Sequence, residues 1–217
     1  MLIQIFKDDA TAYNKKKHKI FKSKGVLNNK ISEHIMLLLA SKKIPTHFVK
    51  RINDREQMIK KCEIIPIEFV VRNIASGSIC SRLGIKDGLK LKKPLLEYYL
   101  KEDSLDDPIV SRDHLELFGW ATKKEIEKID RMSLKINHCL INHFKKKGIT
   151  LVDFKIEFGR LSSNKKKIVL ADEISPDSCR LWDSKSKTKL DKDVFRKGIG
   201  NLIDAYEEVA SRLGIMH

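Results

Sequence analysis

The sequence of 217 residues has few of the features that mark membrane, fibrous or multi-module proteins. It contains only 5 prolines, 10 glycines and 7% aromatic residues, and it has no internal repeat. No apolar run approaches the roughly 20 residues that a membrane helix needs. The N-terminal MLIQIFKDDATAYN lacks the basic, apolar and small-residue order of a signal peptide. We therefore expect a compact cytoplasmic protein that has no contact with a membrane.

The chain also lacks paired metal-binding and nucleophile motifs. Its four cysteines are widely scattered and form no CxxC pair, so neither a zinc site nor a disulfide framework is indicated. The histidines show no HExxH spacing, and there is no GxSxG elbow. We expect the cysteines to be reduced and to pack as small hydrophobic side chains. They are Cys62, Cys80, Cys139 and Cys179.

Acidic residues are in the minority, since 44 Lys+Arg against 29 Asp+Glu give a net charge of +15. Such an excess is compatible with nucleic-acid binding. However, much of it lies in lysine tracts at 15–17, 145–147 and 165–167, which fall at expected loops or a helix end rather than along one stripe. No interleaving of basic and aromatic residues suggests base stacking. We expect solvated loops that help to attract an anionic substrate, and no nucleic-acid partner.

The order of patterns predicts an α+β fold. Up to about residue 75 we expect a β-rich region with one helix at 31–43, where strands at 47–52, 56–64 and 66–73 form an antiparallel meander. From about Gly88 helices take over, first at 94–101 and then after a capping box of Thr122 and Glu125. That second helix ends at Gly148, a charged hairpin follows, and 191–214 is helical. We expect two lobes, 1–87 and 88–217, with the ligand site between them.

The charged hairpin is the most informative segment. In GITLVDFKIEFGRL, alternation places Val152, Phe154, Ile156 and Phe158 on one face and charged residues on the other. These charged residues are Asp153, Lys155 and Glu157. In the returning strand Asp172 and Glu173 are adjacent, so one of them must share the charged face. Facing carboxylates destabilise a sheet unless a cation such as Mg²⁺ neutralises them, whereas the alternative is an ordinary solvated face.

Residues that suit anion binding flank this hairpin. A turn at Ser175-Pro176-Asp177 leads to Arg180, whose planar guanidinium suits phosphate or carboxylate. Further upstream, Arg72 ends a strand and a Ser-Gly-Ser sequence ending at Ser78 precedes a short helix. A helix cap and a turn would explain this second segment equally well. By its residues alone, KEDSLDDPIV indicates only a turn.

Several strings occur in one order along the chain and together resemble the phosphoribosylaminoimidazole-succinocarboxamide synthase (SAICAR synthetase) family of purine biosynthesis. The resemblance covers essentially the whole chain. It rests on FKDDATA, KG followed by NN, PIEFVVRN with SGS, DDP, LVDFKIEFG, DEISPDSCRLWD and DKDVFR.

The resemblance implies a ligase that uses ATP to join aspartate to 5-amino-1-(5-phosphoribosyl)imidazole-4-carboxylate, releasing ADP and phosphate. It also implies a fold related to ATP-grasp proteins and protein kinases, Mg²⁺ as cofactor, and a homodimer. Members usually carry a strand, a GKAK-type loop and another strand upstream of the position of Met1, and we expect 1–87 to lack them. The alternatives are another Mg-ATP phosphotransferase, although no HRD or DFG string is present, or a basic nucleic-acid-binding module.

The resemblance also assigns site residues by position. It implies that Arg72, Ser78 and Arg180 bind the imidazole nucleotide, and that Asp177 meets its ribose or positions Arg180. It implies that Glu157 and Asp172 hold Mg²⁺ on the ATP phosphates, that the backbone of Ile64 meets the adenine, and that Lys155 stabilises developing negative charge. Lys101 and Asp107 are expected near the acidic substrate, and Asp153 is a candidate to accept the proton of the incoming amine.

Overall fold

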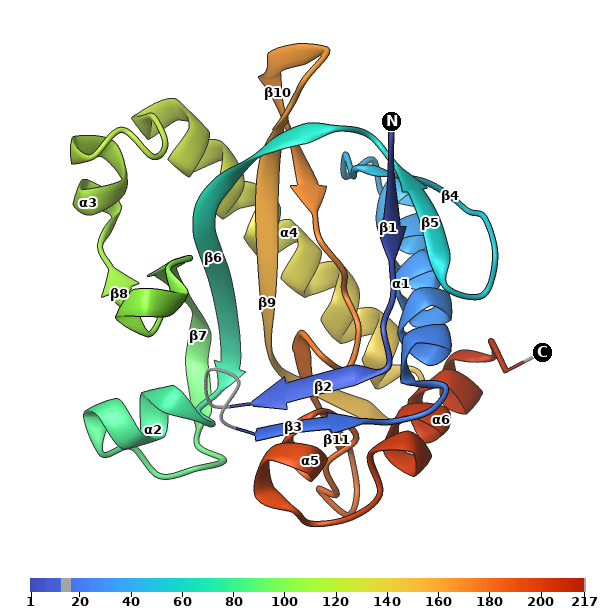
Figure 1. Ribbon diagram of the computed structural model, residues 1–217. Coiled ribbons are helices and arrows are strands. Elements are labelled where there is room, and N and C mark those ends of the chain that lie inside the picture. The colour runs from blue at the N-terminus through green and yellow to red at the C-terminus, as the bar shows by residue number, and fades with distance from the viewer. Residues whose placement is uncertain (13–16, 217) are drawn as a thin grey trace.

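The structure is a computed structural model that describes residues 1–12 and 17–216. At its centre lies a six-stranded sheet (Figure 1). The strand order is β10-β9-β6-β7-β8, and β11 also pairs with β9. All these pairs are antiparallel. The strands are β6 (Cys62–Ile74), β7 (Lys90–Leu100), β8 (Ile109–Val110), β9 (Ile149–Leu161), β10 (Asn164–Ala171) and β11 (Cys179–Asp183).

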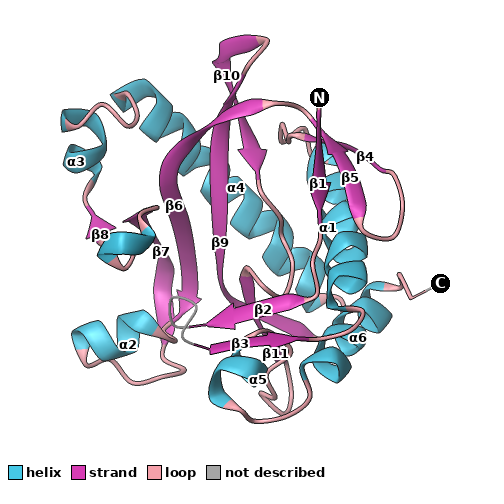
Figure 2. Ribbon diagram, viewed as in Figure 1, coloured by secondary structure: helices cyan, strands magenta, loops and turns pink. Residues whose placement is uncertain are grey.

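Two smaller antiparallel sheets accompany the large one (Figure 2). One has the order β1-β5-β4, and the other is the β2–β3 hairpin, which lies across the lower end of the large sheet in Figure 1. These strands are β1 (Leu2–Ile5), β2 (Asp9–Ala12), β3 (Lys17–Ile20), β4 (Phe48–Arg51) and β5 (Glu56–Ile59).

Helices cover the sheets. The longest, α4, packs on β9 and β6, while α1 packs against α6 and β4. Among the described helices, none is long and apolar enough to cross a membrane. The helices are α1 (Lys24–Ser41), α2 (Ser78–Leu83), a 3-10 turn (Asp103–Leu105), α3 (Arg112–Leu117), α4 (Lys123–Lys145), α5 (Asp193–Lys197) and α6 (Leu202–Leu213).

The alternation predicted for the charged hairpin is confirmed. Val152, Phe154, Ile156 and Phe158 are at most 1% exposed, and β10 returns antiparallel with Ala171 opposite Glu157. The Thr122 and Glu125 capping box is also present, with each side chain accepting from the backbone of the other residue. The α+β fold class is therefore confirmed.

Two predicted elements are wrong. The segment 94–101 is not a helix, and all of it except Lys101 belongs to strand β7, because Tyr98 packs on Phe69 of β6 and the backbone pairs with that strand. The strand predicted at 56–64 ends at Ile59, and its last residues join 66–73 in one long strand, β6, which passes through Pro66. The register shifts between Ile64 and Glu68, which accommodates the proline.

Three other expectations have mixed outcomes. The 191–214 helix is present as two helices, α5 and α6, separated near Gly198, whose φ is +63°. The lysine tract at 145–147 does lie at the end of α4, but 165–167 is in the exposed first half of β10 rather than in a loop, and 15–16 lie outside the described residues. The large sheet takes strands from both 1–87 and 88–217, so the division at residue 87 stays a prediction.

Candidate active site

A cavity of about 440 Å³ lies over the polar face of β9. Its wall contains seven of the site residues predicted from the sequence, contributed by β6, β9, α2, the turn before β8, and β11 with the turn that precedes it. They are Arg72, Ser78, Asp107, Asp153, Lys155, Asp177 and Arg180. Residues that are far apart in the sequence therefore meet at one cavity.

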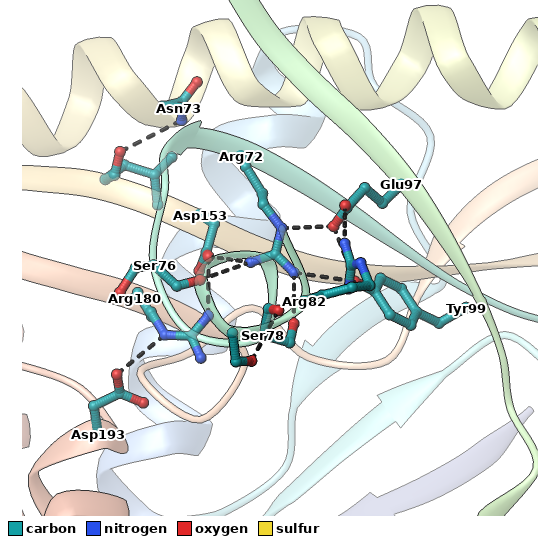
Figure 3. A network of polar contacts seen from close by, with 12 residues as sticks. Arg72, Asn73, Ser76, Ser78, Arg82, Glu97, Tyr99, Asp153, Arg180 and Asp193 are labelled. Carbon is teal, nitrogen blue, oxygen red and sulfur yellow. Dashed lines mark hydrogen bonds and ion pairs between the residues drawn. The ribbon is translucent and has the colours of Figure 1, made fainter. Parts of the chain in front are cut away.

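Asp153 joins the two arginines at the centre of this wall (Figure 3). Its Oδ2 accepts from Arg72 Nη1 at 2.7 Å and from Arg180 Nη1 at 2.9 Å. Burial raises the pKa of Asp153, while Arg180 and Arg72 oppose that rise. Asp153 thus fixes the separation of two guanidinium groups, which are suited to bind a phosphate or carboxylate together.

Arg72 is held from the opposite side by β7. Its Nε donates to Glu97 Oε2 at 2.6 Å, and its Nη2 donates to Tyr99 at 3.2 Å and to the Ser78 hydroxyl at 3.1 Å. Glu97 also pairs with Arg82 of α2. The sequence reasoning missed Glu97 and Tyr99 because it assigned their segment to a helix.

Gly77 makes room for the second guanidinium. A Cβ atom at this position would lie 2.2 Å from Arg180 Nη2 and 2.6 Å from Cζ. The backbone of Gly77 has φ +68° and ψ −135°, a conformation that other residues rarely adopt. The Ser-Gly-Ser segment is therefore more than a helix cap, since its glycine lies directly against Arg180.

A second cluster of charges surrounds Lys155. Its Nζ lies 2.6 Å from Glu68, 3.4 Å from Glu157 and 3.9 Å from Asp172. Lys101 reaches the same cluster, with its Nζ 2.6 Å from Glu157 Oε2. Burial opposes the charged form of Lys155, but the three carboxylates outweigh it and raise its pKa.

The turn after β10 brings Asp172 into this cluster. Asp172 has φ +58°, so the chain turns away from the strand there. Its side chain faces Lys155, as the predicted alternation requires of one of the two adjacent acids. Burial, reinforced by neighbouring Glu157, raises the pKa of Asp172 to about 6. Because the negative charges of Glu157 and Asp172 repel each other, a cation bound between them would be stabilised.

Asp177 lies on the cavity wall but does not hold Arg180. It accepts from Lys24 at 2.5 Å, from Asn28 at 2.9 Å and from Tyr206 at 2.5 Å. Arg180 is held instead by Asp153 and by Asp193 of α5, at 3.1 Å. The expected alternative in which Asp177 positions Arg180 therefore has no contact to support it.

Asp107 lines the cavity, whereas Ile64, Lys101, Glu157 and Asp172 do not. Asp107 is in the predicted turn, where its Oδ1 accepts from the backbone of Glu102 at 2.8 Å. Ile64 is 40% exposed on β6 and does not line this cavity. It pairs with Gly159, toward the same end of the sheet as Glu157.

Glu68 is the main residue of the cluster that the sequence reasoning missed. The β6–β9 register places Glu68 opposite Glu157 and Arg72 opposite Asp153. The alternation of Glu68, Val70 and Arg72 along one strand could have indicated that β6 continues the charged face of β9. Lys192 and Arg196, which also line the cavity, lie in the DKDVFR string but were given no role.

Within residues 1–12 and 17–216, no group of three or more His, Cys, Asp or Glu side chains could hold a metal ion. The described cysteines are all free. A magnesium ion shared with substrate phosphates needs only one or two protein carboxylates. Glu157 and Asp172 meet that requirement.

Comparison with known proteins identifies the family. The family model for SAICAR synthetase matches residues 1–213. The chain belongs to the SAICAR synthetase family. A phosphoribosylaminoimidazole-succinocarboxamide synthase from Pelagibacter ubique (strain HTCC1062) is 60% identical over 218 residues, which cover 100% of this chain and 84% of the relative.

Solved structures agree with this assignment. The enzyme of the same name from Ehrlichia chaffeensis has a TM-score of 0.97 and 50% identity, covering 99% of this chain and 91% of the other. A SAICAR synthetase solved in complex with ADP has a TM-score of 0.94 and 45% identity, covering 97% and 89%. The chain is therefore a SAICAR synthetase in fold and a ligase by family, rather than a kinase-like phosphotransferase or a nucleic-acid-binding module.

Proposed function

We propose that the protein uses ATP to join L-aspartate to the carboxylate of 5-amino-1-(5-phosphoribosyl)imidazole-4-carboxylate, and that the reaction takes place in the cavity over β9. The observation that carries this proposal is the order of charges on β9. Asp153 holds an arginine pair suited to a nucleotide phosphate, and Lys155 and Glu157 follow on the same face with a second acid, Asp172, beside them. An anion site and a cation site thus lie next to each other.

The reaction needs both kinds of site. A carboxylate is a poor electrophile, so the γ-phosphoryl group of ATP is first transferred to an oxygen of the imidazole carboxylate, which gives an acyl phosphate and ADP. The amine of aspartate then attacks the acyl carbon, loses a proton and displaces phosphate. Phosphoryl transfer depends mainly on positioning and on neutralisation of charge.

Arg72, Ser78 and Arg180 are proposed to bind the phosphate of the imidazole nucleotide. Both guanidinium groups are already oriented by Asp153, and Gly77 leaves the space that Arg180 occupies. Prearranged donors avoid the cost of ordering flexible side chains when the substrate binds.

Glu157 and Asp172 are proposed to hold Mg²⁺ on the ATP phosphates. Their position beside Lys155 and the raised pKa of Asp172 fit a cation between the two carboxylates. When bound, the ion would neutralise charge on the transferring phosphoryl group. Lys155 would stabilise the same developing charge from the protein side.

Other assignments remain part of the proposal. Ile64 would meet the adenine through its backbone, and Lys101 and Asp107 would lie near the acidic substrate. Asp177 would approach the ribose. Because Asp153 accepts hydrogen bonds from two guanidinium groups, its contacts support a role in positioning Arg72 and Arg180 more than a role in accepting the amine proton.

Family resemblance also supports a homodimer, a cytoplasmic location and a two-lobed relation to ATP-grasp proteins and kinases. These stay proposals. Analytical ultracentrifugation tests the first directly, and a monomer at micromolar concentration would contradict it.

A coupled assay tests the function. We expect ADP release to require both aspartate and the imidazole carboxylate nucleotide, and the succinocarboxamide to form in equal amount. ADP release that continues when either substrate is omitted would refute the ligation and favour an ATPase or kinase.

A further inference from the structure

Lys192 occupies an unusual place in the wall of the active-site cavity. It is the residue immediately before α5, it is partly buried, and its backbone N–H donates to Pro176 next to Asp177. It lines the cavity. Among the described residues, no hydrogen bond or ion pair is made by its ammonium group. Burial lowers the pKa of Lys192, and the charge of Asp177 only partly compensates.

The other cations of the wall differ in this respect. Arg72 and Arg180 share Asp153, and Lys155 is bonded to Glu68. Arg196 donates to Asp193 at 2.8 Å. A partly buried ammonium without an acceptor is costly, because burial removes water that would otherwise bind it. Such a group is best explained if a ligand supplies the acceptor.

The position of Lys192 points to one ligand. Asp177, the acid whose charge raises the pKa of Lys192 most, already accepts from Lys24, Asn28 and Tyr206. Arg72 and Arg180, which suit a phosphate, are already linked through Asp153, and Arg72 also donates to Ser78. Aspartate brings two carboxylates of its own, beyond any groups that the nucleotide provides. A lysine is suited to bind one of them as a point charge.

We propose that Lys192 binds a carboxylate of the amino-acid substrate and so positions its amine for attack. This inference rests on the proposed function, since it presupposes aspartate as a substrate. It assigns Lys192 a role in binding aspartate, which does not follow from the metal and phosphate assignments.

The test is steady-state kinetics of Lys192→Met, which keeps the aliphatic stem and removes the charge. Loss of a charge-assisted hydrogen bond predicts that the KM for aspartate rises about 10- to 150-fold. The KM values for ATP and for the imidazole nucleotide should change less than threefold. Lys197→Met is the matched control, because Lys197 is the last residue of α5, the helix that follows Lys192, but is exposed and outside the cavity. It should leave all three KM values unchanged.

A second readout uses succinate, which has both carboxylates but no amine. We expect succinate to compete with aspartate, and its inhibition constant to rise in Lys192→Met by the same factor as the aspartate KM. A rise confined to the nucleotide KM, or a lower melting temperature with unchanged aspartate KM and succinate inhibition, would overturn the inference. Wild-type protein that does not require aspartate for ADP release would instead refute the proposed function.

Discussion

The contact between Gly77 and Arg180 allows a sharp test of the proposed phosphate site. Gly77→Ala would place a methyl group 2.2 Å from Arg180 Nη2 and 3.0 Å from Nη1. Real Cβ atoms do not approach other atoms so closely, so the guanidinium must move. Arg180 would then lose its alignment with Asp153, whose Oδ2 now lies 2.9 Å from Nη1.

The size of the effect follows from two separate costs. An alanine held at φ +68° and ψ −135° costs about 1–3 kcal/mol of folding free energy. For a domain of this size, each kcal/mol lowers the melting temperature by about 2–4 °C. Separately, loss of a charge-assisted bond to the substrate phosphate costs about 1.5–3 kcal/mol, which predicts a rise of about 10- to 150-fold in the KM for the imidazole nucleotide.

Gly84→Ala separates these two costs. Gly84 ends the same helix, α2, with φ +65°, but a Cβ there would meet nothing within 4 Å. It should cost about 1 kcal/mol of stability and leave the nucleotide KM unchanged. Steady-state kinetics and thermal melts of both variants measure the difference. If Gly77→Ala changes the nucleotide KM no more than Gly84→Ala does, Arg180 does not bind the nucleotide phosphate as proposed.

Two further predictions concern the carboxylate cluster and a buried histidine. Asp172→Asn should abolish turnover with an unchanged circular-dichroism spectrum, because Asn tolerates the left-handed backbone at φ +58° but binds Mg²⁺ poorly; wild-type activity would remove the metal assignment. Burial lowers the pKa of His47 from its usual 6.5 to about 4, so its contribution to stability is present above pH 6.5 and is lost as pH falls toward 4. Urea titrations should show that the stability lost between pH 7 and 4 is about 3 kcal/mol smaller in His47→Gln than in wild type, and an equal loss in both would contradict this.

Strand β9 could be predicted from the sequence because its signal is local. Each apolar residue from Val152 to Phe158 alternates with a charged one, and both faces of the strand follow from period two. The segment of β7 carries no such alternation. Its paired leucines and tyrosines fit a short helix as well as a strand, and only pairing with β6 decides between them. Pro94 is tolerated in β7 because β8 pairs only with Tyr98 and Tyr99.

The composition of the site could be predicted better than its pairings. Arg72, Asp153, Lys155 and Arg180 were assigned from the family strings, and the structure brings them to one cavity. Which acid binds which base depends on strand register, and register is a property of the assembled sheet. Glu97 could not be assigned to Arg72 while its segment was taken for a helix. The contact of Gly77 with Arg180 joins distant parts of the chain, and no local pattern indicates it.

Burial decides between the two interpretations that the sequence left open for the charged face. Asp153 is 3% exposed and Glu157 is 4% exposed, so this face is not ordinary solvated surface. Buried ion pairs are weak contributors to stability, and apolar side chains of similar volume would often serve the fold as well. A network of this kind is therefore better explained by its ligands than by folding. Because each arginine is held by a buried acid, the two guanidinium groups stay aligned before the substrate arrives.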